Sequence, residues 1–255
     1  MIEKLSVVII TFNEERNIGR CLESVKDLAD EILVLDSLST DATESICADF
    51  NVRFISQPFL GHIEQKNRAA NLATHNWVLS LDADEALTDT LKQDIRKVLA
   101  DPQFRAYRMN RLTNYCGKWV RHSNWYPDTK ARLWDKRSGK WGGENPHDKW
   151  EYSDSKELYG KLKGDILHYS YYTISEHIKQ IEKFTEIAAR VAVDKGRDCS
   201  IARVIFGFWW KFFHTYIIKR GFLDGYTGFL ICSLSAYSSM IKYAKIRQYA
   251  RMKIK

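Results

Sequence analysis

The stretch that decides the fold runs Trp77-Val78-Leu79-Ser80-Leu81-Asp82-Ala83-Asp84-Glu85, an apolar segment that ends in three carboxylates. A short apolar run bounded by polar residues is typical of a buried strand in a parallel sheet. Ligands of such sheets bind beyond the carboxyl ends of the strands, where Asp82 and Asp84 would point the same way. Two close carboxylates favour a divalent cation, but acidic residues also favour the first turn of a helix. On this stretch alone, a metal site and a helix start both remain open.

The residues before this stretch predict a repeating pattern of strands and helices. Strands are expected at Leu5 to Ile10, Glu31 to Leu35 and Val52 to Ile55, with helices between them and a further helix from about Ile63 to Thr74. Asn13 is expected to cap the first helix. This order predicts an α/β fold with a mostly parallel sheet flanked by helices. No GxGxxG turn and no Walker lysine loop is present, which argues against dinucleotide oxidoreductases and nucleoside triphosphatases.

The region from 101 to 170 is less regular. Strands are expected at Arg105 to Asn110 and at Arg132 to Trp134, and His168 is expected at a strand end. Gly139 to Trp150 is expected to be a loop, and such loops often carry function. It brings together Glu144, His147 and Asp148 between two Trp residues. For His147 alone, capping of backbone groups is the simpler interpretation.

Composition separates the C-terminal segment from the rest of the chain. The five cysteines are scattered and form no CxxC, which favours a reducing cytosol over a disulfide framework or a zinc site. The first apolar run is too short for a signal peptide. The net charge is +7, yet residues 200–255 alone hold ten Lys and Arg against one acid, Asp224. The basic character therefore belongs to the C-terminal segment.

This segment is also rich in aromatic residues. Arg203, Gly207, Lys211 and His214 fall at helical spacing and define a narrow polar stripe beside Trp209 and Trp210. We expect residues 199–255 to form helices that lie in a membrane interface, because neither apolar stretch makes a convincing spanning helix. A helical hairpin packed on the catalytic domain is the alternative. The remaining residues 1–198 are expected to form one domain, with a nucleotide half at about 1–100 and an acceptor half at about 101–198.

Five motifs in the first 90 residues are specific enough to compare with known enzymes. They are Val7-Val-Ile-Ile-Thr-Phe-Asn-Glu-Glu, Asn17-Ile-Gly-Arg-Cys-Leu-Glu-Ser-Val, Leu33-Val-Leu-Asp-Ser-Leu-Ser-Thr-Asp, Gln65-Lys-Asn and Leu81-Asp-Ala-Asp-Glu. Together they resemble glycosyltransferase family 2, which implies the GT-A fold and inversion at the anomeric centre of the sugar. Later segments are Arg132-Leu-Trp, Asn145-Pro-His-Asp, His168-Tyr-Ser-Tyr and Lys219-Arg-Gly-Phe-Leu-Asp-Gly. These more loosely resemble the lipopolysaccharide core β-glucosyltransferases.

The resemblance implies a role for each motif residue. Those expected to bind the nucleotide sugar are Thr11, Phe12, Asn13, Glu14, Asp36, Gln65, Lys66, Asn67, Asp82, Ala83 and Asp84. Asp36 would accept a hydrogen bond from the base, which is uracil in most members. Lys66 stands where the family usually has Arg, and would reach the base or the diphosphate as a point charge. Asp84 would bind Mg²⁺ or Mn²⁺ directly, and Asp82 would contact the ribose or a metal-bound water.

An inverting transfer also needs a base that deprotonates the acceptor hydroxyl. Many relatives carry Val-His-Glu where this chain has Pro146-His147-Asp148, so the base is assigned to Asp148, with Glu144 as the rival. Residues expected to contact the acceptor are Trp119, Trp125, His147 and Trp150, although each Trp also suits a core. Arg132 and His168 would face the diphosphate or serve an ordinary structural role.

The expected protein is a metal-dependent inverting hexosyltransferase. By the resemblance, it would move glucose from a UDP-sugar donor onto a lipid-linked or lipopolysaccharide-core glycan. It would act as a peripheral protein on the cytoplasmic face of the inner membrane, without a nucleic-acid partner. A transferase that uses a polyprenyl phosphate as acceptor is one alternative. A basic nucleic-acid-binding α/β protein is an alternative of another class, which the acidic strand ends disfavour.

Overall fold

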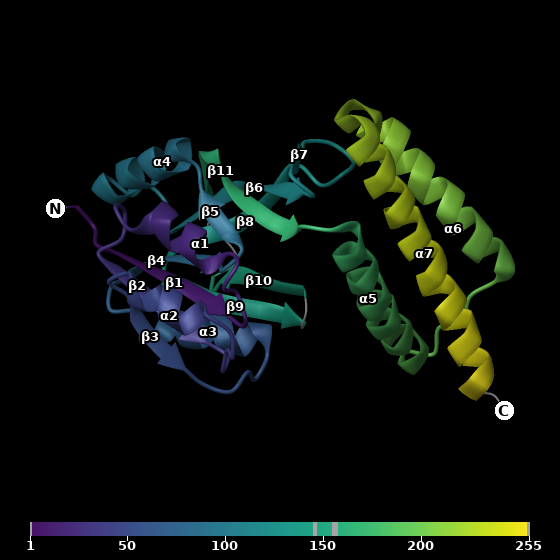
Figure 1. Cartoon of the computed structure of the whole chain (residues 1–255), viewed down its shortest axis with the longest axis horizontal. Helices are drawn as coiled ribbons and strands as arrows, with labels where there is room; N and C mark the ends of the chain where they lie inside the picture. The colour runs from purple at the N-terminus through teal and green to yellow at the C-terminus, as the bar shows by residue number, and fades with distance from the viewer. Residues whose placement is uncertain (1, 145–146, 155–157, 254–255) are drawn as a thin grey trace. The chain divides into compact units, whose positions relative to one another are not determined.

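The computed structural model describes residues 2–144, 147–154 and 158–253, without the side chains of Glu144, His147 and Lys253. The chain divides into two compact units (Figure 1). The first unit comprises Met1–Leu112 and Asp128–Tyr169, and the second comprises Thr113–Pro127 and Ser170–Lys255. The expected domain boundary at residue 198 falls inside the second unit and stays a prediction.

The first unit is built on a sheet whose first half is parallel. Its strands are β1 (Leu5–Thr11), β2 (Glu31–Asp36), β3 (Arg53–Ser56) and β4 (Trp77–Asp82), in the order β3-β2-β1-β4. β1 and β4 are buried along almost their whole length, which explains their near-continuous apolar sequences. Thr11 pairs with Asp36, and Ile10 pairs with Asp82. The polar ends of the three central strands therefore meet at one edge.

The second half of the sheet is antiparallel. Beyond β4 it continues through β8 (Asp128–Asp135), β6 (Ala106–Tyr115), β11 (Gly160–Tyr171) and β5 (Glu85–Leu87), while β7 (Lys118–Val120) pairs with β6. β8 runs antiparallel to both β4 and β6, and β11 runs antiparallel to β5. The predicted α/β class is confirmed, and the sheet is mixed because these later strands return against the parallel ones.

Helices cover both faces of this sheet. They are α1 (Ile18–Val25), α2 (Thr43–Ala48), α3 (His62–Leu72) and α4 (Asp89–Ala100). Side chains alternate along β1, so Val7 and Ile9 share one core cluster with α1 and α4. Val8 joins the opposite cluster with α3 and the buried Trp134. Two cores thus hold the strand ends rigidly in register.

Two local expectations are wrong, and one alternative that the sequence left open is excluded. Asn13 does not cap a helix, because α1 begins only at Ile18 and Asn13 adopts a left-handed conformation with φ 53°. The Asp82 stretch is not a helix start, because Glu85 begins the short strand β5 and Thr88 caps α4 instead. The predicted loop at 139–150 is a hairpin of β9 (Gly139–Glu144) and β10 (His147–Tyr152), in which Trp141 pairs with Trp150.

The second unit is mainly helical. It contains α5 (Ile174–Asp194), α6 (Ile201–Phe213), a π-helical turn (His214–Ile218), a 3-10 turn (Gly221–Asp224) and α7 (Gly225–Lys253), and α7 packs against both α5 and α6. A capping box between Thr173 and Glu176 fixes the start of α5. The Asp224 carboxylate accepts hydrogen bonds from the backbone N–H groups of Arg121 and His122. Among the described residues, no helix combines the length and apolar character needed to cross a membrane.

Candidate functional site

The loops that follow β1 and β2 are joined into one framework at the carboxyl edge of the sheet. The Asn13 backbone N–H donates to Ser39 Oγ, and the Asn13 side-chain oxygen accepts from the Thr40 N–H, both at 2.8 Å. The Glu14 N–H donates to Thr43 Oγ1 at 2.8 Å. Phe12 stands exposed at the rim of this framework. The loops are therefore held in one shape, with an aromatic ring free to meet a ligand.

Asp36 is the buried centre of this framework. It is 2% exposed and accepts hydrogen bonds from the Ser39 N–H at 2.8 Å, Ser39 Oγ at 2.5 Å and Ser56 Oγ at 3.0 Å. Two carboxylate oxygens offer about four acceptor positions, so these bonds leave room for about one more donor. This geometry suits a carboxylate that orders the loop and also meets a single N–H of a ligand.

Asp82 lies between two buried cations. Arg132 Nη2 is 2.7 Å from Asp82 Oδ2, and Lys66 Nζ is 3.1 Å from Asp82 Oδ1. Burial raises the pKa of Asp82, but the positive charges of Arg132 and Lys66 outweigh burial and hold the pKa well below its usual value. Asp82 is therefore ionised, with both oxygens already engaged.

Arg132 also serves the fully buried Glu85. Its Nη2 lies 2.8 Å from Glu85 Oε1, and the Asp82 N–H donates to Glu85 Oε2 at 3.0 Å. Arg111 approaches Glu85 Oε1 at 3.3 Å and Asp128 Oδ2 at 2.8 Å. This network of alternating charges sets the direction of the turn after β4. The sequence pattern does not predict this role of Glu85, because its partners come from β6 and β8.

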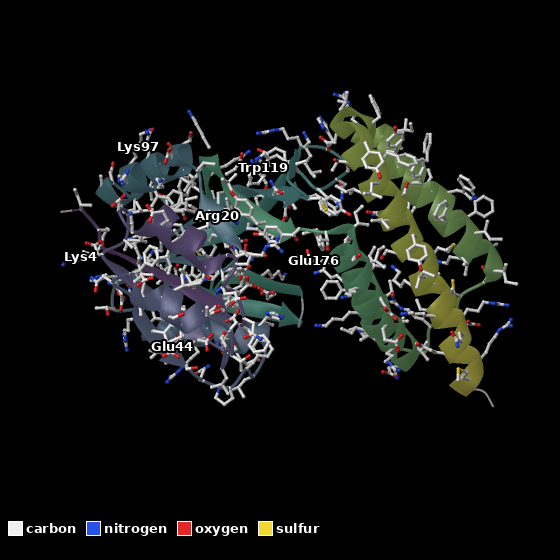
Figure 2. The ribbon with its side chains drawn as sticks, in the orientation of Figure 1. Lys4, Arg20, Glu44, Lys97, Trp119 and Glu176 are labelled. Atoms are coloured by element: carbon white, nitrogen blue, oxygen red, sulfur yellow. The ribbon has the colours of Figure 1, made fainter. Side chains whose placement is uncertain are left out.

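Asp84 has a different neighbour, His168. The His168 Nε2 lies 3.1 Å from Asp84 Oδ2, and the Tyr169 N–H donates to the Asp84 carbonyl at 2.9 Å. Arg20, labelled in Figure 2, projects from α1 and stacks over the Tyr169 ring at 3.7 Å. Burial raises the pKa of Glu14 against the opposing hydrogen bond from Asn17, and the negative charge of Asp84 raises it further. The Asp84 side of the turn is therefore rich in acceptors.

This side suits a divalent cation better than the Asp82 side does. A carboxylate and an imidazole nitrogen are both common ligands, whereas the oxygens of Asp82 are taken up by Lys66 and Arg132. Within the described part of the chain, no group of three or more His, Cys, Asp or Glu residues is placed to hold a metal. Asp84 and His168 fit a cation that takes its other ligands from phosphate oxygens and water, as Mg²⁺ usually does.

Gln65 and Asn67 of α3 have distinct surroundings. Gln65 is buried, and its Nε2 donates to the Leu35 carbonyl at 3.3 Å and to Ser37 Oγ at 3.1 Å. Asn67 Nδ2 donates to the Trp141 carbonyl, and its Oδ1 accepts from the Trp141 N–H, both at 2.9 Å. Gln65 and Asn67 therefore hold the loop after β2 and the strand β9. Their roles in nucleotide binding stay predictions.

Asp148 joins the same network of charged side chains through Lys66. Asp148 Oδ2 accepts from Lys66 Nζ at 2.8 Å, and Lys66 also lies over the Trp141 ring at 4.6 Å. One lysine thus links the end of β4 with the hairpin. The side chains of Glu144, the rival base, and of His147 lie outside the described part of the structure.

A cavity of about 690 Å³ opens beside Asp82 and Asp148. Its lining includes Arg108, Arg132, Trp141 and Trp150, among other residues of β6, β8 and the hairpin. Four of its buried donor atoms have no hydrogen-bond partner among the described residues: Arg132 Nε and Nη1, and the indole N–H groups of both Trp residues. Leaving each such donor unsatisfied costs about 1–3 kcal/mol.

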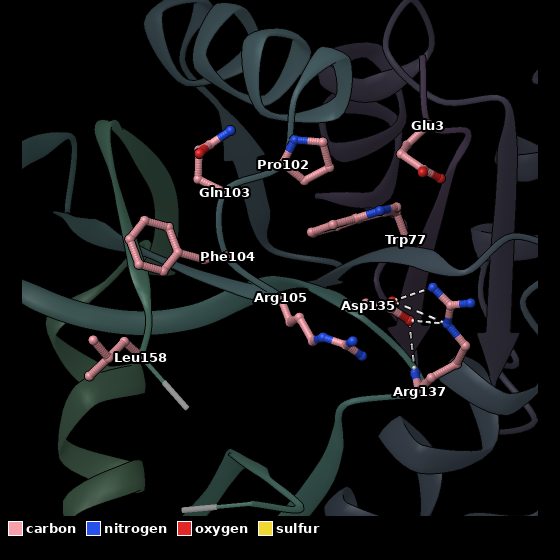
Figure 3. Close-up of a pocket in the computed structure, with 9 residues that line it drawn as sticks. All are labelled: Glu3, Trp77, Pro102, Gln103, Phe104, Arg105, Asp135, Arg137 and Leu158. Atoms are coloured by element: carbon pink, nitrogen blue, oxygen red, sulfur yellow. Dashed lines mark hydrogen bonds and ion pairs between the residues drawn. The ribbon is translucent and has the colours of Figure 1, made fainter. Parts of the chain in front are cut away.

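A second cavity, of about 560 Å³, lies at the opposite end of β4 (Figure 3). Its walls include Trp77, the first residue of β4, and the ion pair between Asp135 and Arg137. None of its described lining residues carries a buried side-chain N or O atom that lacks a hydrogen-bond partner. The unsatisfied buried donors therefore belong to residues that line the cavity beside Asp82, and not to the described residues that line this one.

The Trp residues expected at the acceptor have unequal surroundings. Trp150 is buried and stacks on Trp134 with ring centroids 5.2 Å apart. Trp125 belongs to the second unit, where it packs against Tyr115 and His177. Trp119, labelled in Figure 2, lies on β7 of that unit. Their roles toward an acceptor stay predictions.

Comparisons with known proteins give one family-model match and several relatives that align with almost the whole chain. The family model described as glycosyl transferase family 2 matches residues 6–154. An uncharacterized glycosyltransferase from Rickettsia typhi is 30% identical, over 96% of this chain and 87% of its own length. The lipopolysaccharide core biosynthesis glycosyltransferase LpsC from Rhizobium meliloti is 26% identical, over 98% of this chain and 94% of its own.

Solved structures show a more partial likeness. A glucosyl-3-phosphoglycerate synthase from Mycobacterium tuberculosis, in complex with Mn²⁺ and UDP-glucose, is 24% identical. The match covers 44% of each chain with a TM-score of 0.37. The same enzyme in complex with Mg²⁺ and UDP matches with a TM-score of 0.38.

Proposed function

This chain belongs to glycosyl transferase family 2, with the α/β fold expected of it, and we propose that it is a metal-dependent inverting hexosyltransferase with a UDP-sugar as donor. Glucose is the proposed sugar, and a lipid-linked or lipopolysaccharide-core glycan is the proposed acceptor. The observation that carries the proposal is the meeting of Asp84, Asp82 and Asp148 with His168 and Lys66 at one sheet edge.

The donor half of the proposal rests on two neighbouring groups. The framework around Asp36 would hold the nucleoside, with Phe12 against the base and the remaining acceptor position of Asp36 on a base N–H. Asp84 and His168 would hold Mg²⁺ or Mn²⁺. When bound, such a cation offsets the negative charge of the departing diphosphate.

Asp148 is the proposed base for the acceptor hydroxyl. Its contact of 2.8 Å with Lys66 Nζ fixes the orientation of the carboxylate. Its second oxygen, Oδ1, makes no ion pair with a described residue. Asp148 therefore has one oxygen that is oriented by Lys66 and one that can approach a hydroxyl group.

A first experiment tests the donor site. Release of UDP from UDP-glucose is measured with Mn²⁺ in the wild type and in Asp84→Ala. We expect a loss of about 100- to 1,000-fold, because a positioned charge at the leaving group is removed. Asp89→Ala, which removes an exposed carboxylate in the first turn of α4, should leave the rate unchanged. Equal rates in both variants would contradict the role of Asp84.

A second experiment tests the base. In Asp148→Asn the amide oxygen still accepts from Lys66, but the side chain no longer takes up a proton. Transfer should fall about 100- to 10,000-fold while the affinity for UDP stays within about twofold. A variant that retains full transfer would show that the base lies elsewhere. Lipopolysaccharide-core fragments and short-chain polyprenyl phosphates, offered as acceptors in parallel, decide between the two acceptor classes.

The proposed place of action is the surface of the inner membrane. On α6, Gly207 of the expected polar stripe lies against Tyr243 of α7, and the exposed Arg203 stacks on the same ring. Phe206, Trp209 and Trp210 of the same helix are 73%, 63% and 62% exposed. An exposed aromatic face in a strongly basic segment matches an interface that contains anionic lipids.

A further inference from the structure

The turn that joins β4 to β5 is closed by a side chain. Glu85 Oε2 accepts a hydrogen bond from the Asp82 backbone N–H at 3.0 Å, so the carboxylate reaches back over the two turn residues, Ala83 and Asp84. A Glu makes the same bond in a capping box, but here a strand follows instead of a helix. The place of Asp84 in this turn therefore depends on where the Glu85 carboxylate is held.

Two arginines of other strands hold that carboxylate. Glu85 is 1% exposed, and its Oε1 lies 2.8 Å from Arg132 Nη2 and 3.3 Å from Arg111 Nη1. Among the described residues, the carboxylate makes hydrogen bonds or ion pairs only with these two arginines and the Asp82 N–H. A buried carboxylate is strongly unfavourable unless it is paired, so both arginines fix its position.

The backbone of Glu85 is fixed to the other candidate ligand of the cation. In the antiparallel pair of β5 and β11, Glu85 lies opposite His168. The next residue, Tyr169, donates its N–H to the Asp84 carbonyl at 2.9 Å. Asp84 thus precedes Glu85 in the chain, and His168 lies across from it in the sheet. Glu85 is bound to both neighbours without contacting the carboxylate of one or the imidazole of the other.

We propose that Glu85 is a positioning residue for the divalent cation, because it fixes the separation between Asp84 and His168. Ligands of a metal ion must be held within about 0.5 Å of their productive places. Loss of a partner that orients such ligands typically lowers metal affinity or activity about 10- to 100-fold. The inference rests on the proposed function, which assigns Asp84 and His168 to the cation. A purely structural role of Glu85 would instead change stability alone.

Binding of Mn²⁺ to the protein saturated with UDP tests the proposal, with electron paramagnetic resonance of free Mn²⁺ as the readout. In Glu85→Gln, one amide oxygen replaces two carboxylate oxygens and cannot serve both the Asp82 N–H and the arginines. We expect the dissociation constant for Mn²⁺ to rise about 10- to 100-fold. Glu85→Asp keeps the charge for the arginines but is shorter by one methylene group. It should raise the constant about tenfold, and it tests the proposal even where Glu85→Gln does not fold.

Three controls separate this role from general stability. Asp128→Asn removes a carboxylate that pairs with Arg111 and Lys130 rather than with the turn, and its Mn²⁺ affinity should change less than about threefold. The affinity of Glu85→Gln for UDP in EDTA should stay within about twofold of the wild type, because the framework around Asp36 does not include Glu85. Excess Mn²⁺ should restore most of the UDP release from UDP-glucose that Glu85→Gln loses, since a weakened site refills whereas a misfolded site does not.

The outcomes are separable. If the wild type binds no Mn²⁺ beside UDP, the proposed metal dependence fails, and the inference fails with it. If Asp84→Ala abolishes Mn²⁺ binding while both Glu85 variants bind as the wild type does, only the inference is overturned. Equal weakening in Asp128→Asn would assign the effect to the charged network as a whole and also overturn it. Wild-type Mn²⁺ affinity in Glu85→Gln, with UDP release lost at every Mn²⁺ concentration, would have the same consequence.

Discussion

The two units of this chain solve the problem of buried polar groups in opposite ways. In the first unit, Arg132, Asp82 and Glu85 are buried as charges and stabilise one another. In the second, the buried His177 is surrounded by Tyr115, Trp125 and Tyr171, and burial lowers its pKa to about 4. Paired charges prepare a site for a charged ligand, whereas a neutral aromatic core supports helices whose apolar side chains are exposed.

The largest expected effect comes from breaking the charged network. Arg132→Met leaves Asp82 and Glu85 without their main cation, and Arg132 itself is only 3% exposed. Removal of one partner from a buried pair typically costs about 3–5 kcal/mol. Urea unfolding should register that loss. Lys26→Met is the control, because the pair of Lys26 with Glu23 is exposed to solvent and should contribute little to stability. Similar losses in both variants would show that removal of Arg132 does not leave Asp82 and Glu85 as uncompensated buried charges.

The second effect concerns acid stability and belongs to the second unit. The pKa of His177 falls from 6.5 to about 4 on folding, so the unfolded chain takes up a proton in a range where the folded protein does not. The contribution of His177 to the free energy of unfolding is complete above pH 6.5, falls as the pH decreases, and levels off below about pH 4. The difference amounts to roughly 3 kcal/mol.

His177→Phe isolates this contribution from the carboxylates that titrate in the same range. Free energies of unfolding are compared for the wild type and the variant between pH 7 and pH 4, where the two curves should converge as the pH falls. Parallel curves would show that His177 is protonated in the folded protein as readily as in the unfolded one.

The parallel half of the fold was predictable because its signals are local. β1 and β4 are near-continuous apolar runs, and Asp82 and Asp84 follow β4 directly. The hairpin was not predictable from composition. Its glycines are typical of loops, whereas its stability comes from Trp141, which pairs with Trp150 of the neighbouring strand and whose backbone bonds to Asn67. That information lies in partners distant in sequence.

The same reason limits prediction of the site. Arg132 and His168 belong to β8 and β11, and only the order of the antiparallel strands decides that they meet Asp82 and Asp84. On α6 the predicted helix is present, and Gly207 permits a close approach to Tyr243 of α7, while Arg203 of the same stripe stays exposed. Periodicity identifies two sides of a helix without deciding which side has a partner.

A third, intermediate effect concerns Asn67. Asn67→Ala removes both hydrogen bonds to the Trp141 backbone, at a cost of about 2 kcal/mol. If positioning of the hairpin is its role, urea unfolding should show this loss while the affinity for UDP changes less than about threefold. Asn71→Ala changes an exposed amide of the same helix and should have no effect on either. Intact stability with strongly weakened UDP binding would instead support a direct role in the nucleotide pocket.

The smallest effect on stability should accompany a large effect on location. Trp209 and Trp210 are mostly exposed, so replacing both with Ser should change the free energy of unfolding by less than about 0.5 kcal/mol. Flotation with vesicles that contain an anionic phospholipid should nevertheless fall about tenfold or more, because the aromatic area that enters the interface is removed.

Leu60→Ser removes an equally exposed apolar side chain from the first unit and should float as the wild type does. Added salt should also weaken the flotation of the wild-type protein with these vesicles, since the basic residues of the C-terminal segment would supply the attraction to anionic lipid. Unchanged flotation of the Trp209→Ser, Trp210→Ser variant would exclude α6 as the docking surface. The contrast between the units would then lie only in how each one buries its polar groups, because the exposed aromatic face of α6 would have no lipid partner.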